Sequence, residues 1–81
     1  DPDMWYEKGR AHRVLSQNQL ALPAYNQAIK LNDNKAMFYY ERSKTHYLLQ
    51  DIVKAKDDYQ KSIQLGFQIP QGDTYPAVLG Y

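Results

Sequence analysis

Two histidines are the residues of this chain whose side chains most readily bind metals or transfer protons. His12 and His46 lie far apart in the sequence. A zinc site needs three or four converging ligands, yet the chain contains no cysteine and no His-x-x-x-His spacing. We therefore expect both histidines to be packed, partly buried side chains, and we predict no metal site.

Two sets of carboxylates are the other candidates for chemistry, through general acid–base catalysis. Asp57 and Asp58 are adjacent, and Glu7 and Glu41 form the second set. Such catalysis requires a pocket that shifts the acidity of the carboxyl groups, whereas Asp57 and Asp58 are predicted on a solvated face. The chain also has no P-loop, glycine-rich dinucleotide loop or nucleophile motif. The sequence therefore predicts a protein that is not an enzyme and requires no cofactor.

Composition and charge narrow the class of partner. The 81 residues are 43% hydrophobic and 23% charged, with a formal net charge of +1. Nucleic-acid binding needs a concentrated basic patch, which the sequence lacks, so no nucleic-acid partner is expected. No apolar run approaches the roughly 20 residues of a membrane helix, so no membrane insertion is expected. The absence of cysteine fits reducing and oxidising compartments equally, and the localisation is not predicted.

A 34-residue internal repeat in the sequence indicates which elements position these side chains. The two histidines occupy the same position in the two copies of the repeat. Sequence similarity at a fixed period of this length is typical of helical repeat proteins. Chance rarely gives so many matches at one offset without a gap. The pairs, identical or similar in kind, are Trp5/Tyr39, Tyr6/Tyr40, Glu7/Glu41, Lys8/Arg42, Gly9/Ser43, Arg10/Lys44, His12/His46, Leu15/Leu49, Ala21/Ala55, Tyr25/Tyr59, Ala28/Ser62, Ile29/Ile63 and Leu31/Leu65.

Each repeat contains two helical patterns, in which small and aromatic residues recur at i, i+4 and i+7. The patterns predict helices at about 3–16, 19–31, 36–49 and 52–65. Ser16-Gln17-Asn18 and Asp51 are predicted to stop or cap helices, and Asn32-Asp33-Asn34 is predicted as a turn. Pro23 lies about one turn into the second helix, so that helix is expected to be distorted or to begin late, near Leu20 or Leu22.

The spacing of these residues resembles the tetratricopeptide repeat, whose signature is W-x₂-L-G-x₂-Y, then A-x₃-F, then P. The departures fall at the Leu, Tyr and Pro places. The resemblance implies an all-α, right-handed superhelix of antiparallel helix pairs, with repeats at 2–35 and 36–69. The residues at the places of the signature are Trp5, Lys8, Gly9, His12, Ala21, Tyr25 and Asp33, then Tyr39, Arg42, Ser43, His46, Ala55, Tyr59 and Phe67.

The resemblance also implies a concave groove lined by the first helix of each pair. Residues opposite the Trp5, Gly9 and His12 face should line it, and they combine tyrosines with charged side chains, which often dominate binding energy. The predicted partner-binding residues are Tyr6, Arg10, Arg13, Tyr40, Glu41, Lys44 and Tyr47. The classical carboxylate clamp of chaperone adaptors is not expected, because Tyr6, Arg10 and Glu41 replace clamp residues; instead, Arg10 and Glu41 are expected to pair.

The predicted function is therefore that of an adaptor or scaffold that binds a protein or peptide segment in this groove. The alternative is a structural module whose exposed end stacks on another copy or domain. In that case the protein would form a homo-oligomer or join a larger assembly. Residues 70–81 are expected either to cap the last pair or to begin a truncated third repeat at Ala77–Tyr81. In both cases we expect the tail to be ordered. The chain begins without an initiator methionine and is interpreted as a fragment of something longer.

Overall fold

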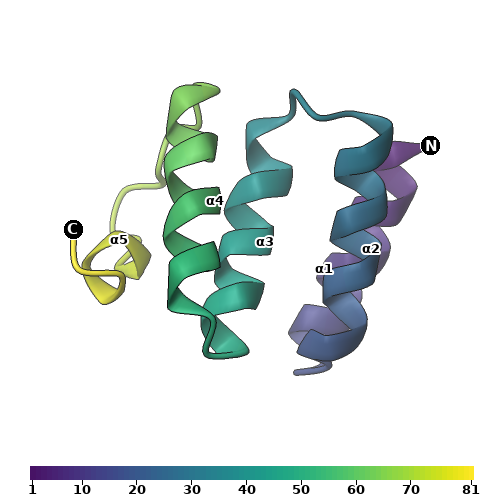
Figure 1. Cartoon of the computed structure of the whole chain (residues 1–81), viewed down its shortest axis with the longest axis horizontal. Coiled ribbons are helices and arrows are strands. Elements are labelled where there is room, and N and C mark those ends of the chain that lie inside the picture. The colour runs from purple at the N-terminus through teal and green to yellow at the C-terminus, as the bar shows by residue number, and fades with distance from the viewer.

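The chain folds into two antiparallel helix pairs followed by one short helical turn, as a computed structural model of residues 1–81 shows. The first pair is α1 (Pro2–Val14) and α2 (Asn18–Leu31), and the second is α3 (Ala36–Leu48) and α4 (Ile52–Gln64). The turn α5 (Tyr75–Val78) lies beside the second pair (Figure 1). The expected all-α architecture of helix pairs is confirmed. None of the helices combines the length and apolar character needed to cross a membrane.

The starts of the helices follow from local capping, and one of them corrects a prediction. Asp1 accepts a hydrogen bond from the Asp3 N–H at 2.9 Å, and Asp51 caps α4 through the Lys54 N–H at 3.2 Å, as predicted. The late start of the second helix is wrong, because α2 begins at Asn18 and contains Pro23. Proline suits helical φ, and the carbonyl that it leaves unpaired lies in the first, solvent-exposed turn of the helix.

Four of the five helices, all except α2, are followed two residues after their last residue by a residue in the left-handed backbone region. These residues are Ser16 (φ 61°), Gln50 (φ 67°), Gly66 (φ 92°) and Gly80 (φ 97°). The N–H of the following residue then reaches back into the helix; for example, the Asp51 N–H donates to the His46 carbonyl at 2.9 Å. Such closures satisfy the last carbonyls of a helix and favour glycine at the left-handed position.

Replacing Gln50 with glycine is expected to stabilise the protein. A left-handed conformation costs a non-glycine residue about 1–2 kcal/mol, while glycine loses more entropy on folding, so we expect a net gain of about 0.5–1 kcal/mol. The midpoint of thermal unfolding should rise by a few degrees, measured by circular dichroism. The control is Gln60→Gly in the middle of α4, which should lower the midpoint because glycine is a poor helix former. A lower midpoint for Gln50→Gly would contradict this account of the turn.

The first core cluster joins the two pairs. Tyr6, Ala21, Tyr25, Ala28 and Phe38 are buried together. Phe38 belongs to α3, and its ring stacks on Tyr6 of α1 with centroids 5.0 Å apart. Gly9 allows a close approach within the first pair, where a Cβ at this position would lie 2.7 Å from the Tyr25 ring.

The second core cluster joins the second pair to the tail. It contains Tyr40, Ala55, Tyr59, Tyr75 and Leu79, with Phe67 packed against it. In this structure the tail therefore packs on the last helix pair. The expected helix opening at Ala77–Tyr81 is wrong, because the helical turn is Tyr75–Val78 and Gly80 ends it.

The tail occupies, in the second pair, the place that α3 occupies on the first. Tyr75 follows Glu41, and Leu79 follows Thr45, at the 34-residue spacing of the repeat. Thr45 and Leu79 are both buried. The repeat spacing therefore persists into α5, although this helical turn is very short.

A buried ion pair links the helices of the second pair and corrects the expectation that Asp57 and Asp58 share a solvated face. Asp57 is exposed, but Asp58 is only 7% exposed. Arg42 of α3 donates from Nε and Nη2 to the two Asp58 carboxylate oxygens, at 2.7 and 2.8 Å, and from Nη1 to Asn26 of α2 at 3.1 Å. The sequence did not show this pairing because Arg42 and Asp58 face each other only after α3 and α4 have packed.

Candidate functional site: the face formed by the first helices

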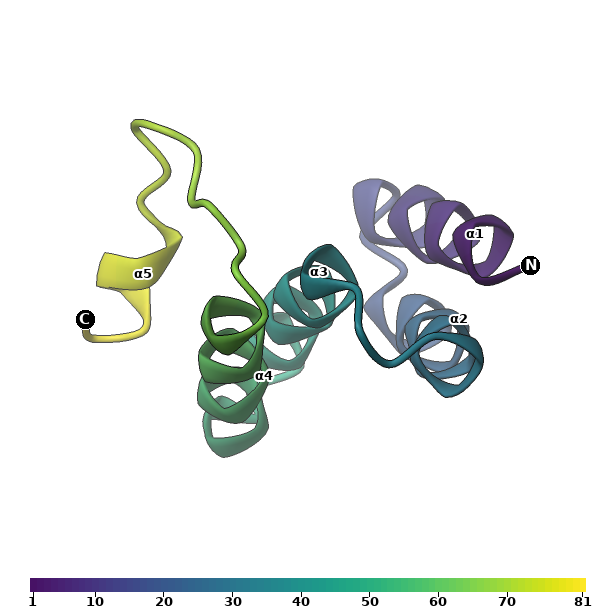
Figure 2. The same ribbon diagram turned by 90° about the horizontal axis from the view of Figure 1, so that it is seen from above.

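The first helices of the two pairs lie on the same side of the molecule, as the view from above shows (Figure 2). Two of the predicted groove residues on this side are part of the core. Tyr6 is 7% exposed and Tyr40 is 2% exposed. The Tyr40 ring stacks on Phe67 with centroids 4.1 Å apart. In this structure the two tyrosine side chains are therefore buried under the face formed by the first helices.

The charged residues predicted for the groove are arranged differently from the expected Arg10–Glu41 pair, which is wrong. Arg13 makes the contact instead, with its Nε 2.9 Å from Oε2 of Glu41. Arg10 lies beside Glu7 of its own helix, at 3.8 Å, and its guanidinium lies over the Tyr6 ring at 5.9 Å. Arg13 lies three residues further along α1, slightly less than one helical turn, and it is the arginine that faces Glu41.

The remaining predicted residues, Arg13, Lys44 and Tyr47, gather around one small hollow of about 240 Å³. The hollow lies between α1, α3 and the tail. Leu48 contributes an apolar wall and is 51% exposed. Its other lining residues come from the tail and are Asp73, Thr74, Tyr75 and Val78.

Asp73 organises the tail side of the hollow. Its Oδ2 accepts a hydrogen bond from the Tyr40 hydroxyl at 2.6 Å, and its Oδ1 accepts one from the Tyr75 N–H at 2.9 Å. The Tyr40 hydrogen bond, the backbone bond and Lys44, 3.7 Å away, hold the pKa of Asp73 below its usual value. Asp73 therefore stays ionised and balances Lys44, as Glu41 balances Arg13.

Sequence reasoning did not assign the tail residues to this site. The Tyr75 hydroxyl lies 2.6 Å from Ser43 Oγ, and the Tyr75 ring meets the Tyr47 ring edge-on at 6.1 Å. The available signal was the 34-residue spacing from Glu41 to Tyr75, which continues the repeat past Phe67.

The tyrosines of this face are neutral side chains at ordinary pH. Burial, reinforced by the Glu41 carboxylate, raises the pKa of Tyr6 to about 12. Burial likewise raises the pKa of Tyr75 to about 12. No group of three or more histidine, aspartate or glutamate side chains is arranged to hold a metal ion. The face thus offers aromatic and apolar contacts and internally balanced charges.

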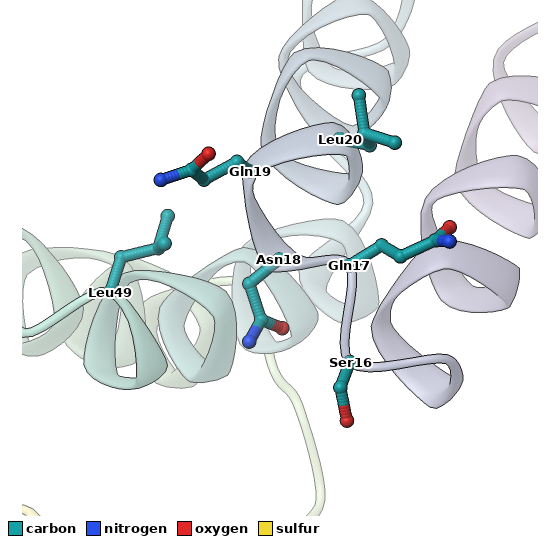
Figure 3. Close-up of a pocket in the computed structure, with 6 residues that line it drawn as sticks. All are labelled: Ser16, Gln17, Asn18, Gln19, Leu20 and Leu49. Carbon is teal, nitrogen blue, oxygen red and sulfur yellow. The ribbon is translucent and has the colours of Figure 1, made fainter.

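A larger hollow, of about 390 Å³, lies at the α1–α2 turn (Figure 3). It is lined by Ser16, Gln17, Asn18, Gln19, Leu20 and Leu49. These are short polar turn residues and two leucines, with no charged or aromatic side chain. The hollow is therefore a surface crevice at the turn, and we place the candidate site at the smaller hollow.

Paired antiparallel helices related by a 34-residue period, with close packing at Gly9 and a face built from the first helices, define a helical-repeat protein. The model of the tetratricopeptide repeat family matches residues 2–35. Residues 2–35 are therefore a tetratricopeptide repeat, and the second helix pair follows them at the 34-residue spacing.

The chain is also similar to a part of two curated proteins. The chain is 31% identical over 65 residues to dynein axonemal assembly factor 4 of Pongo pygmaeus, and 32% identical over 65 residues to the protein of that name from Rattus norvegicus. Each match covers 80% of this chain and 16% of the relative. The match to the repeat family points to protein–protein interaction.

Proposed function

We propose that this chain is an adaptor module that binds an extended segment of a partner protein along the face formed by α1, α3 and α5. One observation carries the proposal: Arg13, Lys44 and Tyr47, from two helices and two repeats, converge on one hollow with exposed Leu48. The similarity to an assembly factor supports the same role, since assembly depends on holding other proteins.

The chemistry of the hollow favours an apolar anchor on the partner segment. Small-molecule sites usually enclose about 300–1,000 Å³, so a hollow of about 240 Å³ suits a single side chain. Arg13 and Lys44 are already balanced by Glu41 and Asp73, so an incoming carboxylate gains little. Leu48 and Tyr47 offer apolar contact, and the charged pairs form a polar rim of the kind found around binding hot spots.

Peptide display against the whole chain, followed by measured dissociation constants, tests the proposal. For selected peptides we expect Leu48→Lys to weaken binding by about tenfold or more, because a central apolar anchor contributes over about 1 kcal/mol. The matched control is Val53→Lys, which changes an exposed apolar residue of α4 that is 72% exposed. It should leave the dissociation constant unchanged. Leu48 is half exposed, so the variant should fold, as circular dichroism will verify.

Peptides that bind Leu48→Lys and wild type equally would place recognition elsewhere. Self-assembly is the second candidate function, and exposed apolar residues favour it, namely Met4 and Val14 on α1 and Leu15 directly after it. Light scattering of the same preparation separates the two functions. A strict monomer over a wide concentration range would exclude self-assembly. Concentration-dependent dimers without peptide binding would exclude binding of a partner segment along the α1–α3–α5 face.

A further inference from the structure

Each helix pair has a hollow along the line where its two helices meet, and we call this hollow the seam. The seams of the two pairs occupy equivalent positions, yet their lining side chains differ in chemistry. In the first pair, α1 and α2 enclose a hollow of about 340 Å³, and in the second, α3 and α4 enclose one of about 390 Å³. Their lining residues correspond at 34-residue spacing. The equivalent pairs are Lys8/Arg42, His12/His46, Leu20/Lys54, Pro23/Asp57 and Ala24/Asp58.

In the seam of the second pair, the Asp58 carboxylate neutralises the Arg42 guanidinium. Asp58 receives two hydrogen bonds from Arg42 and lies 3.5 Å from Nε2 of His46. Arg42 also lies over the Tyr39 ring at 5.6 Å. Burial lowers the pKa of His46 despite the nearby carboxylate, which leaves Arg42 as the principal partner of Asp58.

In the first pair the cation is present and the carboxylate is missing. Lys8 lies over the Trp5 ring at 5.1 Å, as Arg42 lies over Tyr39. The place of Asp58 is taken by Ala24, and Lys8 makes none of the ion pairs of the structure. His12 uses Nδ1 to bond the Gln17 side chain at 2.8 Å, so its Nε2 is left for another group.

The seam of the first pair is also open to solvent. The hollow of the second pair is walled on one side by Leu22 and Asn26 of the neighbouring α2. No third helix lines the hollow of the first pair, where Leu20 is 56% exposed and Pro23 is exposed. An incoming group therefore meets an apolar floor of Trp5, Leu20 and Pro23 beside the ammonium of Lys8.

We propose that this seam, formed by Trp5, Lys8, His12, Leu20, Pro23 and Ala24, binds an acidic side chain of a partner protein. The carboxylate takes the place over Ala24 that Asp58 fills in the second pair, and it pairs with Lys8. A neighbouring apolar residue of the partner packs on Trp5 and Leu20. Charge complementarity identifies the occupant, since the seam carries a cation without its counter-ion. The site is distinct from the α1–α3–α5 face and is independent of the function proposed there.

Trp5 provides a direct reporter, because it is the only tryptophan of the chain. The probe is a blocked pentapeptide, Gly-Leu-Glu-Leu-Gly, compared with its Glu→Gln counterpart. Titration is followed by the indole N–H signal of Trp5 in nuclear magnetic resonance spectra. We expect the glutamate peptide to shift this signal saturably, and the glutamine peptide to bind up to about fivefold more weakly, as expected from the loss of one partly exposed ion pair.

Two variants decide whether the seam carries the binding. Lys8→Gln changes an exposed side chain and should weaken the glutamate peptide by about fivefold, while Lys30→Gln, on the exposed part of α2, should change nothing. Ala24→Asp supplies an internal carboxylate at the position equivalent to Asp58 and should abolish peptide binding. If Ala24→Asp fails to fold, the comparison of Lys8→Gln with Lys30→Gln still decides. Equal shifts from both peptides, or binding indifferent to Lys8→Gln, would overturn the proposal.

Discussion

Deleting residues 70–81 is expected to lower the thermal unfolding midpoint by more than about 10 °C. The deletion removes Tyr75 and Leu79, both buried against the second helix pair, and uncovers Tyr40 and Tyr59. Loss of a buried aromatic residue alone costs about 3–5 kcal/mol, and each kcal/mol moves the midpoint of a domain this size by about 4–8 °C. Circular dichroism or calorimetry of the shortened chain gives the measurement.

Point variants locate this stabilisation within the tail. Tyr75→Ala should reproduce most of the loss, because the Tyr75 ring contacts Tyr40, Tyr47 and Tyr59 and its hydroxyl bonds Ser43. The matched control is Val78→Ala in the same turn, whose side chain is half exposed, and it should have little effect. An unchanged midpoint after the deletion would show that the tail is a passive linker.

Asp58→Ala is expected to destabilise the protein by about 2–3 kcal/mol. Removing one partner of a buried ion pair leaves the other charge without compensation, which costs about 3–5 kcal/mol when burial is complete. Arg42 keeps some solvent contact and its bond to Asn26, so the expected cost is lower. Chemical denaturation with urea gives the free energy of unfolding.

The adjacent residue provides the control for this experiment. Asp57 is exposed and takes part in none of the ion pairs of the structure, so Asp57→Ala should change the free energy of unfolding by less than about 0.5 kcal/mol. Equal losses for Asp57→Ala and Asp58→Ala would mean that net charge matters rather than the Arg42 contact.

The sequence predicts the helix pairs of this fold well because the information is local and is repeated. The small and aromatic residues of each helix recur at helical spacing, and the capping aspartate at Asp51 acts on the turn beside it. The ends of the helices shift by one or two residues. Ser16, for instance, enters the left-handed region and therefore lies outside α1.

The arrangement of charges was not predictable to the same degree, because it depends on how helices rotate against each other. Arg10 and Arg13 are separated by less than one helical turn, yet only Arg13 faces Glu41. Asp57 and Asp58 are neighbours with opposite surroundings. The contribution of the tail to the candidate groove was missed for a different reason: α5 is too short for helical periodicity to be recognised, although its spacing from α3 follows the repeat.

The contact between α3 and the first pair makes the two ends of the molecule different. Phe38 and Thr45, buried in that contact, correspond at 34-residue spacing to Met4 and Ala11 on the outer face of α1, where Met4 is 69% exposed. The opposite end is covered by Tyr75 and Leu79. The contact is therefore directional: the face of α1 that carries Met4 is exposed, whereas the equivalent place on the second pair holds the tail.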